Sequence, residues 1–365
     1  MNNFIRTIQC YFKNEKLEYN GDVKSAIKVF NKQSLASFLY FVYGDKFKNV
    51  YLASVLIQNK FFQLQREISV LFNEASISHF FIKGTILCSL YPDEALRTRG
   101  DIDVVVEPKN YAKAKQILEQ NGYTFLDEIQ YHTGYEKNKL EVELHQALFH
   151  NDDIFYEYFS EPFKHTRVKN QSELLLDENY HFIYAVCHFN KHLMYGEGLR
   201  YIIDFYYMQK KWNLNYVKII GDLEKLGLKQ LFINIQACIH YLTGEKFYGF
   251  QDIEIEYMLN YLLNSGIHAW GDDEQIFHNA IIKHENTSRF KFLLKTLFLT
   301  NLESRQRLYP KLSKRKIYYP ILLIHRFFYL CFNKTKRLFQ LLKLNKKKNN
   351  ELINLKKQIG IVEEL

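Results

Sequence analysis

The chain has 365 residues, of which 47% are hydrophobic and 24% are charged, and its formal net charge is +9 at pH 7. This length and apolar content allow a sizeable core and predict two or three lobes. The five cysteines are scattered and never stand in CxxC spacing, which argues against a disulfide framework or a structural zinc site and fits a reducing cytoplasm. The N-terminal segment lacks the apolar core of a signal peptide, and no apolar run approaches the ~20 residues that span a bilayer.

The N-terminal part of the chain predicts helices followed by a short strand. Apolar residues recur at helical spacing from residue 23 to about residue 75. The residues expected on one side of the last of these helices are Leu56, Phe61 or Phe62, Ile68 and Leu71. The apolar run SISHFFIKG then predicts a strand that ends at Lys83 and Gly84. The next segment, TILCSLY, predicts a helix that begins at Thr85 and ends before Pro92.

Strands and helices alternate in the segment that follows. DIDVVVEP predicts a second strand, and NYAKAKQILEQNGY predicts an amphipathic helix with Gly122 at its C-terminal end. KLEVELHQAL alternates strictly from Leu140 to His145, which is typical of a half-exposed strand. Helical patterns return at about Glu178 and continue to about residue 300. The sequence therefore predicts an α+β fold with a small core of mixed sheet and helices between helical regions. The expected divisions are residues 1–75 and 151–303 for the helical regions, 76–150 for the core, and 304–365 for a basic amphipathic tail.

Two aspartates stand two residues apart at the start of the second strand. Successive strand side chains point to opposite faces, so Asp101 and Asp103 share a face and repel each other. Such a pair is costly unless a cation lies between them, and Mg²⁺ or Mn²⁺ is the natural candidate because both accept oxygen ligands. On the third strand, Glu141, Glu143 and His145 also share a face. If the two strands are neighbours, one glutamate completes a cluster of three carboxylates, which can hold two metal ions for nucleotide chemistry. Taken singly, these acids are equally typical of strand ends and solvated faces.

Basic residues and a glycine precede the two aspartates. Gly84, between a predicted strand and a helix, lets backbone N–H groups approach phosphate oxygens, and the helix N-terminus adds a favourable dipole. Lys83 either meets a phosphate as a point charge or extends its ammonium group into solvent. Arg97 and Arg99, in the turn before Asp101, either hold a triphosphate or form structural ion pairs.

The stretch from FIKG to EVELHQAL resembles an uncharacterised nucleotidyltransferase family of the DNA polymerase β superfamily. The residues that match the pattern of this family are Lys83, Gly84, Tyr91, Arg97, Asp101, Asp103, Gly122, Tyr123, Glu143, Leu144 and His145. The resemblance implies a small polymerase-β-like core and a metal-binding triad of Asp101, Asp103 and Glu143. The chain departs from the pattern at two places. The wider superfamily usually has Gly-Ser where Lys83 and Gly84 stand, and members of the family often carry Asp in place of Glu143.

A second motif, CHFNKHLMYGEGLRYIIDFYYM, is also similar to members of this family. The matching residues are His188, Lys191, His192, Gly198, Arg200 and Asp204. Arg200 and Asp204 are four residues apart and can pair on one helix face, either as a helix–helix clamp or as contacts to substrate. Lys191 and His145 are further candidates for contacts to substrate or to the helical lobe. His188 and His192 have the spacing of a metal pair, but no HExxH motif or third ligand accompanies them.

The basic residues are concentrated near the C-terminal end of the sequence. Residues 304–350 hold fourteen Lys or Arg and no Asp or Glu, so the rest of the chain is acidic overall. We consider three interpretations: a terminal helix with a solvated basic face, a peripheral contact to an anionic membrane through residues 304–348, and, less favoured, a surface for nucleic acid or acidic polysaccharide. The abundance of Phe, Tyr, Lys and Asn throughout the chain is typical of an AT-rich genome and does not itself indicate nucleic-acid binding.

Together these features predict a cytoplasmic, metal-dependent nucleotidyltransferase. It would move a nucleoside monophosphate from a nucleoside triphosphate, with ATP expected, to an acceptor hydroxyl, and release pyrophosphate. Asp101 and Asp103 are predicted to bind both metal ions, and Glu143 to bind one of them and accept the hydroxyl proton. The residues predicted to hold the triphosphate are Lys83, Gly84, Arg97 and Arg99. The alternatives are an enzyme that transfers AMP to protein or RNA, and a membrane-associated accessory or scaffold protein of surface-polysaccharide assembly with an inactive core.

Overall fold

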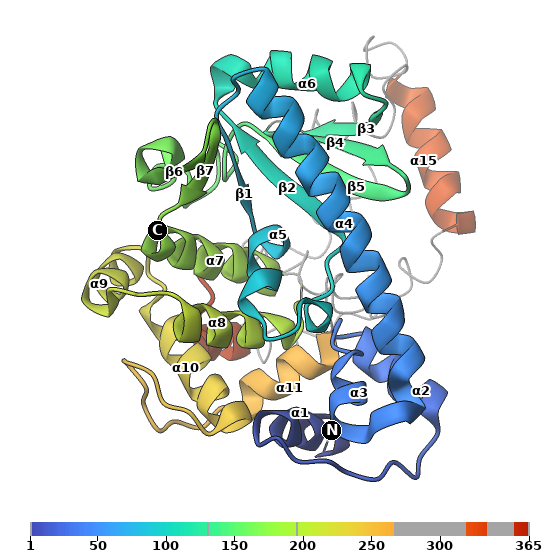
Figure 1. Cartoon of the computed structure of the whole chain (residues 1–365), viewed down its shortest axis with the longest axis vertical. Helices are drawn as coiled ribbons and strands as arrows, with labels where there is room; N and C mark the ends of the chain where they lie inside the picture. The colour runs from blue at the N-terminus through green and yellow to red at the C-terminus, as the bar shows by residue number, and fades with distance from the viewer. Residues whose placement is uncertain (1, 130, 195, 266–318, 334–353, 364–365) are drawn as a thin grey trace.

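The computed structural model describes residues 2–129, 131–194, 196–265, 319–333 and 354–363. Within this part of the chain, seven strands form one sheet, with helices on its faces and below it in the view of Figure 1. The strands are β1 (His79–Ile82), β2 (Asp101–Val106), β3 (Thr124–Ile129), β4 (His132–Lys137), β5 (Leu140–His145), β6 (Thr166–Asn170) and β7 (Glu173–Leu176). Their order is β3-β4-β5-β2-β1-β7-β6. The predicted α+β fold with a mixed sheet is confirmed.

The helices fall before, within and after the sheet. The first ones are α1 (Asn2–Phe12), α2 (Val23–Asn31), α3 (Phe38–Tyr43) and α4 (Lys48–Glu74), and those between strands are α5 (Gly84–Leu87) and α6 (Tyr111–Gln120). The later ones are α7 (Glu178–Leu193), α8 (Arg200–Lys211), α9 (Tyr216–Lys225), α10 (Lys229–Thr243), α11 (Glu256–Ser265) and α15 (Tyr319–Asn333). No helix among the described residues is long and apolar enough to cross a membrane.

Helix α4 runs across one face of the sheet (Figure 1). Its buried apolar residues, Phe61, Leu64, Ile68 and Phe72, recur every three or four positions and pack against the sheet. Leu56 was expected on this face, but 65% of it is exposed. The buried stripe reaches back through Gln58 and Ser54, so Leu56 lies between these positions on the opposite side of the helix.

The two faces of the sheet have different partners. Ile102 and Val104 of β2 and Val142 of β5 join the core beneath α4 and α6. Val105 of β2 belongs to the larger core that includes the C-terminal helices. Because side chains alternate along a strand, Asp101 and the other polar residues of its face are directed toward the lobe formed by those helices.

Four of the strands were not predicted from the sequence. β3 and β4 extend the sheet beyond β5, and β7 and β6 extend it beyond β1. Strand β7 pairs with β1 in parallel, with His79 opposite Glu173. The sheet thus continues to residue 176, into the span that the sequence assigns to a helical region. Strands β4 and β6 contain many charged and polar residues, as in HTGYEK and TRVKN, so the apolar pattern that indicates a strand is weak in them. Strand β7, ELLL, is a short apolar run that does not by itself distinguish a strand from a helix.

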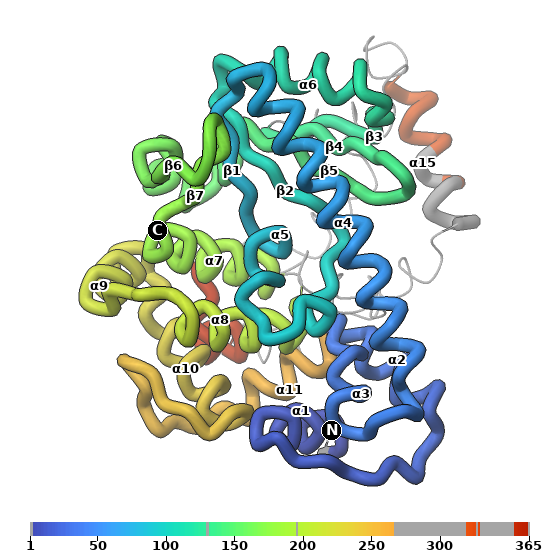
Figure 2. Tube along the Cα trace, viewed as in Figure 1, coloured from blue at the N-terminus to red at the C-terminus, as the bar shows by residue number. Residues whose placement is uncertain are grey.

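The last described residues, 354–363, return to the helical lobe (Figure 2). Asn190 of α7 donates a hydrogen bond to the carbonyl of Val362 and accepts one from its amide, and Ile359 is fully buried. This segment is therefore part of the folded core. Most of the predicted basic tail, residues 304–318 and 334–353, lies outside the described residues.

Candidate active site

Strand pairing brings the three predicted carboxylates together. β2 and β5 are parallel neighbours, and their register places Asp103 opposite Glu143. Carboxylate oxygens of Asp101, Asp103 and Glu143 lie within 4.8 Å of one another. We call these three residues the carboxylate triad. Glu141, the other glutamate of β5, is exposed and lies outside this group.

Lys83 provides a positive charge within the triad. Its Nζ donates a hydrogen bond to Asp103 Oδ1 at 2.6 Å and lies 3.7 Å from Glu143 Oε2. The residue has a φ of +51°, a conformation that is uncommon for non-glycine residues and is often found at functional sites. At Gly84, an added Cβ would lie 3.2 Å from Arg97 Nη1, so glycine allows the turn to pack closely against that arginine.

Two histidines lie beside the triad, and we call them the histidine pair. His145 of β5 is 2% exposed, and its Nε2 lies 3.1 Å from both Asp103 Oδ1 and Glu143 Oε2. His132 of β4 stands opposite it in the antiparallel register, with its Nε2 3.7 Å from Glu143 Oε1. His145 was predicted as a contact residue, whereas His132 was not identified. Its strand has no clear alternation, and only the pairing of β4 with β5 brings it to the site.

The charges of the triad are unequally compensated. Burial and the neighbouring charge of Asp103 raise the pKa of Asp101 to about 7. For Glu143, burial acts to raise the pKa, but the hydrogen bond with His145 and the charge of Lys83 lower it below its ordinary range. For Lys83, burial acts to lower the pKa, but the Asp103 carboxylate raises it well above its ordinary value. A further cation would therefore act most strongly on the ionisation of Asp101.

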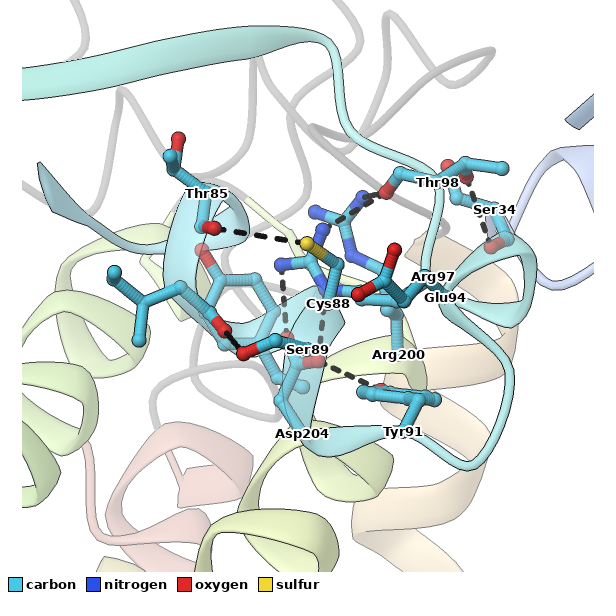
Figure 3. A network of polar contacts seen from close by, with 12 residues as sticks. Ser34, Thr85, Cys88, Ser89, Tyr91, Glu94, Arg97, Thr98, Arg200 and Asp204 are labelled. Atoms are coloured by element: carbon cyan, nitrogen blue, oxygen red, sulfur yellow. Dashed lines mark hydrogen bonds and ion pairs between the residues drawn. The ribbon is translucent and has the colours of Figure 1, made fainter. Parts of the chain in front are cut away.

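Arg97 is buried in a network with the helical lobe (Figure 3). Its Nε donates to Asp204 Oδ1 at 2.8 Å and its Nη2 to Asp204 Oδ2 at 3.0 Å, while Tyr91 OH donates to Asp204 Oδ1 at 2.7 Å. The arginine side chain is 5% exposed and the aspartate side chain 2%. The sequence suggested an ion pair between Arg200 and Asp204 within one helix. Asp204 of α8 pairs with Arg97 instead, because the turn before β2 brings Arg97 against α8. Arg97 joins the core to the helical lobe.

Arg99 contacts α4. Its Nε donates to Gln58 Oε1 at 3.0 Å and its Nη1 to Gln65 Oε1 at 3.4 Å. The guanidinium group lies 5.0 Å from the ring centre of Phe61 and 4.7 Å from that of Phe62. Its hydrogen-bond partners are thus neutral side chains, in contrast to the ion pair with the carboxylates that the sequence suggested.

Arg200, the first residue of α8, is 8% exposed. Its Nη1 donates to the carbonyl of Thr98 at 3.4 Å, and its Nε is buried without a hydrogen-bond partner among the described residues. Burial lowers the pKa of Arg200 below its ordinary value. Its positive charge acts on Asp101, where it opposes the rise in pKa. Arg200 therefore brings a poorly compensated positive charge to the triad.

The model of a protein family described as "Uncharacterised nucleotidyltransferase" matches residues 33–244. This span is more than half of the chain and includes the triad, Lys83 and the arginine network. The chain belongs to this family. The resemblance found in the sequence is confirmed, and nucleotidyl transfer is supported as the general activity of this site. No curated protein and no solved structure matches the chain.

A pocket of about 410 Å³ is lined by Tyr131 and Gln146, which are the chain neighbours of His132 and His145. The ring of Tyr131 is 5.9 Å from that of His145. Lys191 lies at the same wall, with its Nζ 5.7 Å from the ring centre of Tyr131 and 5.6 Å from that of Phe149. The same Nζ donates to Asp153 at 2.8 Å. Lys191 is thus placed beside the pocket and outside the triad.

The second histidine motif of the chain lies on α7. The Nε2 atoms of His188 and His192 are 3.1 Å apart, and His192 Nδ1 lies 3.5 Å from Glu197 Oε2. Tyr201 OH is 3.2 Å from His188 Nδ1. The described residues contain two groups of three possible metal ligands, and neither includes these histidines. Their contacts join α7 to α8 and the segment between them.

Proposed function

We propose that this protein transfers a nucleoside monophosphate from a nucleoside triphosphate, with ATP expected, to an acceptor hydroxyl. The observation that carries the proposal is the carboxylate triad, held by two adjacent strands in a chain of the nucleotidyltransferase family. In the reaction, a bond forms between the acceptor oxygen and the α-phosphorus. The bond from the α-phosphorus to the bridging oxygen breaks, and pyrophosphate leaves.

The donor set of the triad fits a divalent cation. Asp103 is fully buried, and its Oδ2 has no hydrogen-bond partner among the described residues. A buried carboxylate oxygen without a partner is costly, and a hard cation such as Mg²⁺ or Mn²⁺ would satisfy it. We expect Asp101 and Asp103 to hold two ions and Glu143 to hold one of them. When bound, such ions lower the pKa of an attacking hydroxyl and neutralise charge on the departing phosphates.

Lys83 and Arg200 are the basic residues that we assign to the triphosphate. Lys83 already lies among the triad oxygens and can turn its ammonium group toward a phosphate when cations enter. Arg200 has a buried Nε without a partner, and an anion would compensate its charge. Arg97 acts as a positioning residue, because its donors already serve Asp204 and the carbonyl of Thr98. Arg99 is bound to the glutamines of α4 through Nε and Nη1, and its buried Nη2 has no partner among the described residues, so this atom could also serve a phosphate.

Glu143 is the group that we assign to the acceptor proton. Its side chain is 28% exposed, whereas that of Asp103 is fully buried, and so it is accessible to an entering hydroxyl. Its hydrogen bond with His145 and the charge of Lys83 lower its pKa and keep it ionised. Movement of Lys83 toward a phosphate would remove one of these stabilising charges and make the Glu143 carboxylate a stronger base. The proton released by the acceptor thus goes to Glu143 as the new bond to phosphorus forms.

The test is incorporation of label from an α-labelled nucleoside triphosphate into an acceptor from a cell extract. We expect Asp101→Asn and Asp103→Asn each to abolish incorporation while circular dichroism shows a retained fold. Glu141→Gln is the matched control, since Glu141 is an exposed carboxylate of β5 outside the triad. Full incorporation by either aspartate variant would refute the assignment. The identity of the labelled molecule distinguishes a small-molecule acceptor from a protein or an RNA.

A further inference from the structure

The histidine pair and Glu143 form a second group of possible metal ligands. His132 and His145 are opposite each other on β4 and β5, with ring centres 4.9 Å apart. The two rings present their Nε2 atoms to different oxygens of Glu143. His132 Nε2 lies 3.7 Å from Oε1, and His145 Nε2 lies 3.1 Å from Oε2. One carboxylate therefore separates two imidazoles on one side of the triad.

These separations are close to those around a shared metal ion. Bonds of about 2.0–2.2 Å from a metal such as Zn²⁺ to imidazole nitrogen and carboxylate oxygen place neighbouring ligand atoms roughly 3–3.5 Å apart. The distance from His145 Nε2 to Glu143 is already in this range. The longer distance from His132 requires only a small movement of a side chain that is 12% exposed.

Hydrogen bonds among these groups leave several atoms unsatisfied. Among the described residues, Asp103 Oδ2, His132 Nδ1 and His145 Nδ1 are buried and have no hydrogen-bond partner. Asp103 is fully buried and His145 is 2% exposed, and His145 Nε2 is directed at both Asp103 and Glu143. A buried polar group without a partner is costly. A metal ion bound by the Nε2 atoms leaves Nδ1 of each ring unchanged, so of these atoms only Asp103 Oδ2 could gain a bond to such an ion.

We propose that His132, His145 and Glu143 bind a first-row transition-metal ion in preference to Mg²⁺. Imidazole nitrogen suits ions such as Fe²⁺, Ni²⁺ and Zn²⁺, and Mn²⁺, although it favours oxygen ligands, also accepts imidazole beside a carboxylate. Mg²⁺ instead requires oxygen ligands in near-ideal octahedral geometry. The inference rests on the proposed function to the extent that Glu143 belongs to both groups. Its carboxylate would bridge the histidine site and the site between Asp101 and Asp103, which makes one of the two metal positions of the enzyme nitrogen-ligated.

The test uses Mn²⁺ alone with the full-length protein, without nucleotide. Electron spin echo envelope modulation should show ¹⁴N coupling from imidazole ligands of the bound ion. His132→Gln and His145→Gln should each reduce this coupling and raise the dissociation constant for Mn²⁺ at least about tenfold, as disturbing a ligand sphere commonly does. His150→Gln is the matched control, because His150 is hydrogen-bonded to Asp152 and belongs to neither group of possible metal ligands. The ¹⁴N coupling and the Mn²⁺ affinity of this variant should equal those of the unmodified protein.

Three results would overturn the inference. They are bound Mn²⁺ without ¹⁴N coupling, coupling that is undiminished in both His132→Gln and His145→Gln, and no binding of Mn²⁺ at millimolar concentration. Two variants are used so that a folding defect in one leaves the other informative. The proposed function is judged separately by the aspartate variants. If Asp101→Asn loses transfer but the unmodified protein shows no ¹⁴N coupling, the proposed function stands and the histidine site is refuted. If the unmodified protein shows ¹⁴N coupling but Asp101→Asn keeps full transfer, the histidine site stands and the proposed function is refuted.

Discussion

The pair between Arg97 and Asp204 provides a sharp test of whether this arginine holds the two lobes together or holds a nucleotide. Replacing Asp204 by Asn would leave the Arg97 guanidinium, 5% exposed, without a compensating charge. The carboxylate accepts two hydrogen bonds, of 2.8 and 3.0 Å. Asn has a single acceptor oxygen, so one of these bonds would be lost and the other would no longer be made to a charged group. Breaking a buried ion pair in this way costs about 3–5 kcal/mol. We expect Asp204→Asn and Arg97→Met each to lower the free energy of unfolding by that amount.

The assay is urea unfolding followed by circular dichroism, for the two single variants and the double variant. Since the double variant leaves no uncompensated charge, we expect it to cost much less than the sum of the single changes. Strictly additive costs, or a single-variant cost below about 1 kcal/mol, which is typical of an exposed pair, would refute the reasoning. If Arg97 instead bound the triphosphate, Arg97→Met would weaken nucleotide binding while the free energy of unfolding stayed unchanged.

Three further predictions follow from particular residues. Arg200→Met should weaken binding of a nucleoside triphosphate at least about tenfold in calorimetry, since one charge-assisted hydrogen bond contributes about 1.5–3 kcal/mol; unchanged affinity would remove Arg200 from the phosphate site. Burial lowers the pKa of His181 to about 4 from 6.5, so protonation favours the unfolded chain. The free energy of unfolding should fall by up to about 3 kcal/mol as pH drops from 6.5 to 4. His181→Phe should reduce that slope, and an identical slope would refute this origin. If the basic tail binds an anionic membrane, each basic residue contributes ~1 kcal/mol. Replacing the three lysines at 346–348 by Gln should then lower the affinity for anionic vesicles, measured by sedimentation, about 100-fold. Neutral vesicles should bind neither form.

The choice of variant for the tail depends on the structure. Deleting residues 304–365 would remove Ile359, which is fully buried, and Val362, which exchanges two hydrogen bonds with Asn190. Such a deletion would disturb the core of the helical lobe as well as the charge. Neutralising the lysines at 346–348 changes the charge and keeps that packed segment.

The local sequence predicted the central strands and the two aspartates of the triad, and it left Glu141 and Glu143 as candidates for the third acid, of which the family resemblance implied Glu143. Alternation along β2 and β5 placed Asp103 and Glu143 on the polar faces of their strands, and the structure pairs these strands with the two residues opposite each other. Lys83 at the end of β1 was also predicted as a basic residue of the site. These features depend on the period of two along a strand and on the residues that end it, which are properties of consecutive residues.

The partners of the basic residues were decided by the tertiary structure. Arg97 pairs with Asp204, 107 positions away, and His132 reaches Glu143 because β4 pairs with β5. Strand β7 is a short leucine run that could belong to a helix or a strand, and its parallel pairing with β1 makes it part of the sheet. The sequence by itself therefore determined which side chains share a face of each element. Which faces meet depends on pairing and packing between segments far apart in the chain, where burial and charge compensation select the partner.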